Sequence, residues 1–227
     1  MTIFFDLDGP LLDVSPRYVA LHHHLLREVG VGGMPGGPYW GRKRARVPEE
    51  RILEELGASA HAVDYLRRRL ELIETPDYLA YDRCWPWVEG ILSGLADQYD
   101  LVLVTVRSQR PALLEELERL DLARFFREIL SVPSDHHVDR QKAGLIRDFL
   151  GRHRRSPQGS WMVGDTEADI DAGRLVGLHT AGVLCGIRDR QHLAAARPDV
   201  LLDDIRALPQ ALGASLRPVA SGFSVVE

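Results

Sequence analysis

Short apolar runs alternate with helix-type segments along most of the chain. Each run is too short for a helix and is apolar enough for a buried strand. The predicted strands are residues 3–5, 100–105, 128–131, 161–163, 180–184 and 200–202. The helices predicted among them are residues 88–98, 111–120, 139–150 and 168–176. This alternation favours an α/β core, a parallel sheet with right-handed crossovers and helices on both faces.

A helical segment, residues 14–84, separates the first strand from the rest. Its first helix is predicted over residues 15–29, because serine followed by proline is typical of a helix start. Glycine and proline predict a loop over residues 30–37, and a second helix is expected over residues 48–57. The pattern therefore indicates a helical insert within an α/β chain.

A third helix of the insert is expected to start at Ser59. Its predicted apolar face consists of Val63, Leu66, Leu70 and Ile73. The resulting organisation is a core of residues 1–13 and 85–212, an insert of residues 14–84, and an irregular tail of residues 213–227.

Composition excludes several classes of function. The chain has 227 residues, a net charge of −5 and a pI near 6.0, which does not favour non-specific nucleic-acid binding. No apolar run approaches a membrane span, and the first residues lack the features of a signal peptide. The only cysteines, Cys84 and Cys185, form no disulfide framework or zinc pattern, which fits a reducing cytoplasm. We expect a cytoplasmic monomer or homodimer.

Polar side chains lie at the ends of the predicted strands or just beyond them. They are Asp6 and Asp8 after the first strand, Thr105, Lys142 in the helix after the third strand, and Asp165 and Asp169. The carboxyl ends of parallel strands share one edge, where α/β proteins bind their ligands. These residues are therefore expected to converge, with Asp6 and Asp8 as candidate nucleophile and proton donor.

Gathered carboxylates repel one another. At a separation of about 4 Å and an effective dielectric constant of about 20, each pair costs on the order of 4 kcal/mol. One lysine is insufficient compensation, whereas Mg²⁺ takes carboxylate, phosphate and water oxygens. The sequence therefore indicates a magnesium site. The alternatives are that Asp165 only caps a helix and that Lys142 only faces solvent.

The motifs, taken in order, resemble those of the haloacid dehalogenase superfamily, in its phosphoglycolate-phosphatase-like branch. The first is Asp6-Leu7-Asp8-Gly9-Pro10-Leu11-Leu12-Asp13, the second is Thr105 at a strand end, the third is Lys142, and the fourth is Gly164-Asp165-Thr166-Glu167-Ala168-Asp169. The resemblance implies a Rossmann-like core in which the insert acts as a cap over the site.

The resemblance also implies roles. Asp6 would form an aspartyl-phosphate, and Asp8 would protonate the leaving oxygen and then accept a proton from water. The implied Mg²⁺ ligands are Asp6, Asp8 through its backbone carbonyl, Asp165 and Asp169. The implied phosphate ligands are Thr105, Val106 and Lys142. The expected substrate is a small phosphorylated metabolite.

Several questions stay open from the sequence. Pro10 replaces the usual threonine of the first motif, either as a tolerated turn variant or with an altered rate. In the basic run of residues 42–46, expected in a loop, Lys43 and Arg44 contact the substrate in one interpretation and only solvent in the other. The alternatives to a phosphatase are a phosphomutase of the same superfamily and a non-catalytic metabolite-binding protein.

Overall fold

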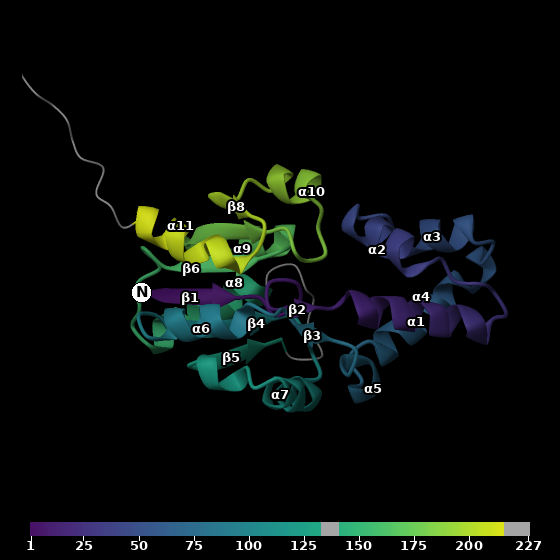
Figure 1. Cartoon of the computed structure of the whole chain (residues 1–227), viewed down its shortest axis with the longest axis horizontal. Coiled ribbons are helices and arrows are strands. Elements are labelled where there is room, and N and C mark those ends of the chain that lie inside the picture. The colour runs from purple at the N-terminus through teal and green to yellow at the C-terminus, as the bar shows by residue number, and fades with distance from the viewer. Residues whose placement is uncertain (133–140, 216–227) are drawn as a thin grey trace, which may run out of the picture.

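The computed structural model describes residues 1–132 and 141–215. Its central element is a six-stranded sheet in the order β5-β4-β1-β6-β7-β8, with every neighbouring pair parallel (Figure 1). The strands are β1 (Thr2–Phe5), β4 (Asp100–Thr105), β5 (Glu128–Ser131), β6 (Trp161–Gly164), β7 (His179–Val183) and β8 (Val200–Leu202). The predicted α/β fold is confirmed, and each predicted strand lies within one residue of the observed ends.

Helices cover both faces of this sheet because successive strand residues point to opposite sides. On one face Ile3 and Phe5 join a cluster with Leu92 of a covering helix. On the other face Phe4 packs edge-on against Phe149, with 5.5 Å between ring centroids. The helices of the core are α6 (Val88–Ala96), α7 (Arg110–Arg119), α8 (Gln141–Arg152), α9 (Glu167–Val176), α10 (Arg190–Ala195) and α11 (Leu208–Ser215).

The insert has its own helices and its own hydrophobic cluster, which includes Leu21, Leu53 and Tyr65. Its helices are α1 (Ser15–Glu28), α2 (Gly36–Arg44), α3 (Glu49–Glu55), α4 (Ala62–Leu72) and α5 (Pro76–Leu79). The two chain segments joining it to the core lie side by side, because β2 (Leu12–Asp13) pairs antiparallel with β3 (Arg83–Cys84). We interpret this arrangement as a core into which a separate helical unit is inserted (Figure 1).

Two predictions within the insert are wrong. The basic run does not lie in a loop, since Arg42, Lys43 and Arg44 form the last turn of α2. The predicted apolar face of α4 is half wrong: Leu66 and Ile73 pack against the cluster of the insert, but Val63 and Leu70 are 80% and 74% exposed. Tyr65 turns inward instead, and its hydroxyl lies 3.0 Å from Nδ1 of the buried His22. Tyr65 thus belongs to the buried face of α4, where it also joins the hydrophobic cluster of the insert.

The tail prediction needs a smaller correction. Residues 213–215 continue α11, which Leu212 anchors in the core, so the chain is not irregular from residue 213 onward. The rest of the tail lies outside the described residues. So does Asp139, which was predicted to cap the helix observed as α8.

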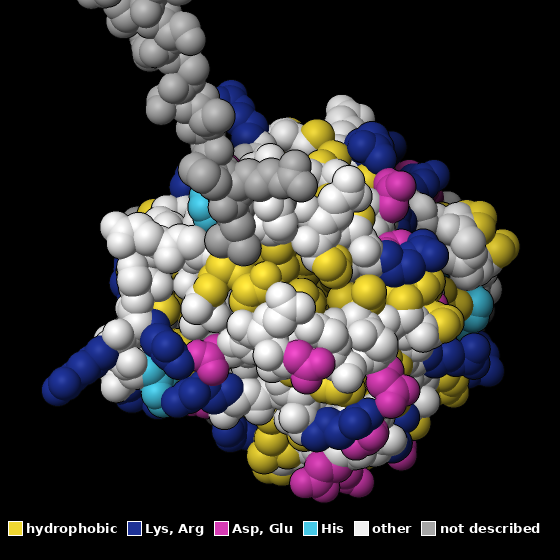
Figure 2. Space-filling view, turned by 60° about the vertical axis from the view of Figure 1, so that its left-hand side comes forward, with side chains coloured by type: hydrophobic (Ala, Val, Ile, Leu, Met, Phe, Trp, Pro, Cys, Tyr) yellow, Lys and Arg dark blue, Asp and Glu magenta, His cyan; other side chains and the backbone are white. Residues whose placement is uncertain are grey.

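The helices, the surface charges and the cysteines can be compared with what the composition suggested about membranes, nucleic acids and disulfides. Within the described ranges, no helix combines the length and apolar character needed to cross a lipid bilayer. On the face shown in Figure 2, described acidic and basic side chains are interspersed and form no continuous basic surface. Cys84 and Cys185 are free thiols.

Candidate active site

The site is built on the carboxyl ends of the central strands. The backbone N–H of Asp6 donates to the carbonyl of Val163 at 2.9 Å, which places Asp6 beside the end of β6. Thr105 ends the neighbouring β4, and both side chains are buried. Because β4 and β6 flank β1 and run parallel to it, residues about 60 and 100 positions apart in the chain meet at one edge.

Three buried carboxylates meet there. One oxygen from each of Asp6, Asp165 and Asp169 lies within 4.8 Å of the others. Lys142 lies among them, with Nζ 2.8 Å from Oδ1 of Asp6 and 2.5 Å from Oδ1 of Asp169. The structure thus brings together Asp6, Lys142, Asp165 and Asp169 as predicted, and Lys142 is buried rather than exposed to solvent.

Asp165 is held by the backbone around it. Its Oδ2 accepts a hydrogen bond from the N–H of Ile187 at 2.5 Å, whereas its Oδ1 is buried and has no hydrogen-bond partner among the described residues. A Cβ added at Gly9 or Gly186 would lie 2.2 or 1.9 Å from Oδ2 of Asp165, so only glycine fits at either position. A buried carboxylate oxygen without a donor is what a cation ligand requires, so these residues fit a hard divalent ion.

The charged groups of the cluster shift one another's pKa values. Burial raises the pKa of Asp6 to about 7, against the lowering effect of the Lys142 charge, and the charge of Asp169 raises it further. Burial, followed by the charges of Asp6 and Asp169, also raises the pKa of Asp165 well above its usual value. Desolvation opposes the charged form of Lys142, but the two carboxylates beside it outweigh that effect and raise its pKa. Without a cation, the protonated forms of Asp6 and Asp165 are therefore favoured.

Asp169 both caps a helix and belongs to the carboxylate cluster. Its Oδ2 accepts from the backbone N–H and the hydroxyl of Thr166, at 3.0 and 2.7 Å, which forms a capping box at the start of α9. Its Oδ1 faces Lys142. The cap of α9 thereby fixes one of the three carboxylates in the site.

Asp8 points away from this cluster toward two arginines. Arg107 donates to Oδ1 of Asp8 from Nε at 3.1 Å and from Nη2 at 2.5 Å, and Arg17 donates to Oδ2 at 2.6 Å. Burial alone would raise the pKa of Asp8, but the charges of Arg107 and Arg17 outweigh it and hold this pKa below its usual range. Since Arg17 belongs to α1, the insert forms a direct ion pair with this carboxylate of the core.

Two further buried acids complete this network. Asp82 lies 3.2 Å from Nε of Arg17 and 2.8 Å from Nη2 of Arg107, and Glu116 also pairs with Arg107. Burial raises the pKa of Asp82 to about 8 although both arginines lower it. From the sequence, Arg107 could face either substrate or solvent, and nothing pointed to Arg17, Asp82 or Glu116. No sequence motif could have found them, because the network depends on how the insert folds back onto the core.

Thr105 and Val106 differ in their surroundings. The Thr105 hydroxyl accepts from the backbone N–H of Arg107 at 3.3 Å, and Val106 is 40% exposed. Their predicted role as phosphate ligands stays a prediction.

Pro10 lies in a turn whose hydrogen bonds do not require a donor at this position. The turn is closed by the N–H groups of Gly9, Leu11 and Leu12, so the missing donor of Pro10 is not needed there. This pattern favours the interpretation of Pro10 as a tolerated turn variant.

The two basic residues proposed as substrate contacts are occupied elsewhere. Nζ of Lys43 lies 2.7 Å from Oε1 of the buried Glu49, inside the insert. The Arg44 guanidinium donates to the backbone carbonyls of Leu184 and Gly186 in the core. In this conformation neither side chain is free to meet a substrate anion.

Comparison with known proteins agrees with this geometry. The model of the family described as haloacid dehalogenase-like hydrolase matches residues 3–183, and the chain belongs to this family. Both the family and the class of enzyme, a hydrolase, are therefore confirmed.

Curated relatives match over most of their length. The chain is 28% identical over 214 residues to a phosphoglycolate phosphatase of Pseudomonas putida, covering 91% of this chain and 77% of that protein. It is 27% identical over 234 residues to the pyrophosphatase PpaX of Anoxybacillus flavithermus, covering 95% and 98%. The solved structure of a haloacid dehalogenase-like hydrolase from Streptococcus pneumoniae superposes with a TM-score of 0.74 at 20% identity, covering 95% and 98%, which supports the fold.

The Arg17 network generates a stability prediction. Arg17→Met removes one partner from both Asp8 and the buried Asp82, so we expect the free energy of unfolding to fall by about 3–5 kcal/mol, as when a buried ion pair is broken. Urea denaturation measures this loss. Arg67→Met is the control, because Arg67 is 58% exposed and its pairs lie on the surface of one helix, and it should change stability by about 0.5 kcal/mol or less. Equal losses in the two variants would contradict the prediction.

Proposed function

We propose that this protein is a Mg²⁺-dependent phosphatase that hydrolyses a small phosphorylated metabolite through an aspartyl-phosphate. The observation that carries the proposal is the buried cluster of Asp6, Asp165 and Asp169 around Lys142 at the carboxyl edge of the sheet. The relatives are named for phosphate-ester and pyrophosphate hydrolysis, so 2-phosphoglycolate and pyrophosphate are the first compounds to test.

Asp6 is the proposed nucleophile. Its Oδ1 accepts from the N–H of Leu7 at 2.9 Å and faces Lys142, which leaves Oδ2 to attack phosphorus. The attack forms an Asp6–phosphorus bond and breaks the bond to the leaving oxygen. Asp8 would protonate that oxygen, which requires Asp8 to take up a proton and to leave the Arg17 and Arg107 contacts that favour its ionised form here. Water then attacks the phosphorus and gives a proton to Asp8, and the Asp6–phosphorus bond breaks, which releases phosphate and restores the Asp6 carboxylate. Thr105, Val106 and Lys142 would hold the phosphoryl oxygens.

The metal ligands would be Asp6, Asp165, Asp169 and the backbone carbonyl of Asp8. When bound, Mg²⁺ supplies charge neutralisation and polarisation of the phosphoryl group. Lys142 keeps part of the negative charge paired, and Gly9 and Gly186 leave room for the Asp165 carboxylate. The insert would act as a cap that closes over this edge and excludes water.

Three further assignments belong to the proposal. Residues 14–84 are the cap, and residues 1–13 and 85–212 are the catalytic core. We place the enzyme in the cytoplasm, where two free thiols are expected to stay reduced, and expect a monomer or homodimer.

The products separate the proposal from its alternatives. A phosphatase releases inorganic phosphate in an amount equal to the substrate consumed. A phosphomutase would instead return an isomer of the substrate, and a binding protein would turn over neither compound. A screen of phosphorylated metabolites with Mg²⁺ and phosphate detection distinguishes the three.

Substituting the nucleophile tests the mechanism. Asp6→Asn preserves shape but replaces the nucleophilic carboxylate with an amide, so we expect a loss of at least about 100-fold in kcat with the fold retained. Steady-state phosphate release measures the rate, and circular dichroism checks the fold. The control is the exposed Asp97→Asn, which should keep the wild-type rate. A well-folded Asp6→Asn enzyme with more than about one per cent of the wild-type rate would refute covalent catalysis by Asp6.

The raised pKa of Asp6 predicts how pH affects metal binding. Between its unfolded value of 3.8 and its folded value of about 7, the metal-free protein keeps a proton that the unfolded chain has lost. This group's contribution to stability is therefore present at low pH and is lost as pH rises through that window. Below about pH 7 the cation must also displace this proton, so Mg²⁺ should bind more weakly there.

Thermal unfolding with and without Mg²⁺ checks this prediction. We expect the Mg²⁺-induced rise in Tm to be larger at about pH 8 than at about pH 5.5, because only an ionised cluster binds the ion fully. Asp165→Asn should abolish the rise at both pH values. A rise in Tm that is the same at both pH values, or one that survives in Asp165→Asn, would count against the proposed metal site.

A further inference from the structure

Arg44, at the end of α2, joins the insert to a loop of the core. Its Nη1 donates to the carbonyl of Gly186 at 2.6 Å and its Nη2 donates to the carbonyl of Leu184 at 2.8 Å. The Arg44 carbonyl in turn accepts from the backbone N–H of Asp189 at 3.1 Å. This carbonyl lies in the last turn of the helix, where no intrahelical donor remains. Three hydrogen bonds therefore tie one residue of the insert to residues 184–189.

The opposite side of the same loop supports Asp165. The N–H of Ile187 donates to Oδ2 of Asp165 at 2.5 Å, and Gly186 lies so close to Asp165 that no side chain fits there. The carbonyl of Gly186 and the N–H of Ile187 belong to one planar trans peptide unit, so they point in opposite directions. When Arg44 holds the carbonyl, it also directs the N–H toward Asp165.

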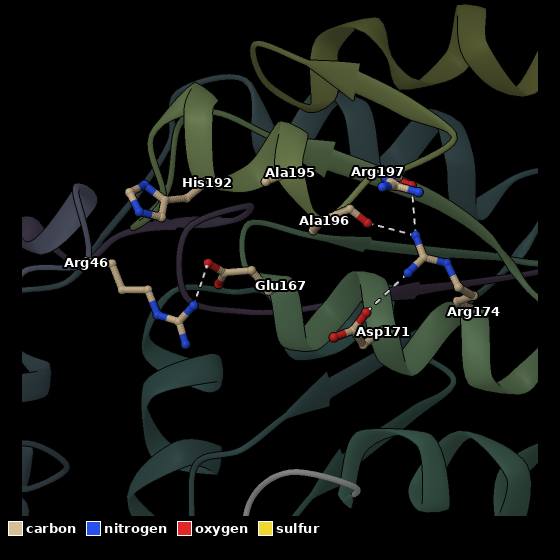
Figure 3. Close-up of a pocket in the computed structure, with 8 residues that line it drawn as sticks. All are labelled: Arg46, Glu167, Asp171, Arg174, His192, Ala195, Ala196 and Arg197. Carbon is tan, nitrogen blue, oxygen red and sulfur yellow. Dashed lines mark hydrogen bonds and ion pairs between the residues drawn. The ribbon is translucent and has the colours of Figure 1, made fainter.

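The neighbouring basic residues do not hydrogen-bond to the loop of residues 184–189. Arg42 pairs with Glu55 at 2.6 Å and Lys43 pairs with Glu49, both within the insert. Arg46 crosses to the core, but its contact with Glu167 is 3.5 Å long and its side chain is 63% exposed (Figure 3). An exposed pair of this length contributes little. The groove that Arg46 and Glu167 flank, about 660 Å³ in volume, separates the insert from α9 and α10 at this point.

We propose that Arg44 is a positioning residue through which closure of the insert orients Asp165 for metal binding. Its guanidinium fork suits the task because it holds two carbonyls at once, which a lysine cannot do in the same geometry. The proposal rests on the proposed function only in taking Asp165 as a cation ligand. It also accounts for why Arg44 has no carboxylate partner among the described residues, although the two basic residues before it do.

Arg44→Met tests the proposal, because methionine keeps much of the apolar stem and removes the donors. Titration calorimetry on the metal-free full chain should show an Mg²⁺ dissociation constant about tenfold higher than in wild type, the effect of losing one charge-assisted hydrogen bond. Arg42→Met, on the same helix turn, is the matched control and should bind Mg²⁺ as wild type does. Arg44→Lys, which can keep one of the two contacts, should fall between wild type and Arg44→Met and serves if the methionine variant does not fold. Wild-type affinity in Arg44→Met, or in Arg44→Lys where only that variant folds, would overturn the proposal.

A second readout needs neither metal nor turnover, so it separates this proposal from the proposed function. In the metal-free protein, hydrogen exchange of the Ile187 amide should be about tenfold faster in Arg44→Met than in wild type or Arg42→Met. If wild type shows no Mg²⁺ binding, the metal site fails, and this exchange rate alone decides whether Arg44 positions the peptide. Unchanged exchange at Ile187 would overturn the role of Arg44 even in an active enzyme.

Discussion

Repulsion among three buried carboxylates is the constraint on which the rest of the site depends. Asp6, Asp165 and Asp169 are held within 4.8 Å of one another and out of water, which raises the pKa of both Asp6 and Asp165. The fold offsets this cost only in part, through Lys142 and through N–H donors of Leu7, Thr166 and Ile187. The remaining deficit, with one buried oxygen of Asp165 unpartnered, is what a divalent cation would remove.

The insert reaches the catalytic edge from two sides. On one side Arg17 holds Asp8, the residue we propose as acid and base, and Asp82 near the end of the insert holds the same arginine. On the other side Arg44 holds the loop that supports Asp165. Because both links to the core run through the paired strands β2 and β3, a rotation of the insert about them would disturb both contacts. The position of the insert and the geometry of the site are thereby coupled.

The sequence could predict the core and the cluster for simple physical reasons. Buried parallel strands are continuous apolar runs, so β4 was predicted to the residue, and the residues at the strand ends must converge once the sheet is parallel. The insert was harder. Local composition suggested a loop where α2 continues through Arg44, and helical periodicity placed Val63 and Leu70 on the buried face of α4, where Tyr65 is buried instead.

The partners of Asp8 lay beyond any local pattern. Arg17 and Arg107, together with Asp82 that pairs with both, come from three parts of the chain, and each alone looks like an ordinary surface residue. Only the folded insert brings them together as a buried network. The same holds for Arg44, whose partners are backbone carbonyls about 140 positions away and leave no signature in side-chain composition.

The central claim is that Asp6 becomes phosphorylated during turnover. The most direct test quenches the enzyme during turnover of its best substrate and reduces it with borohydride, which converts an aspartyl-phosphate to homoserine. Peptide mass spectrometry then locates the change. The account predicts homoserine at Asp6, dependent on substrate and absent from Asp165→Asn. Homoserine at another carboxylate, or none in an enzyme quenched while turning over, would contradict it.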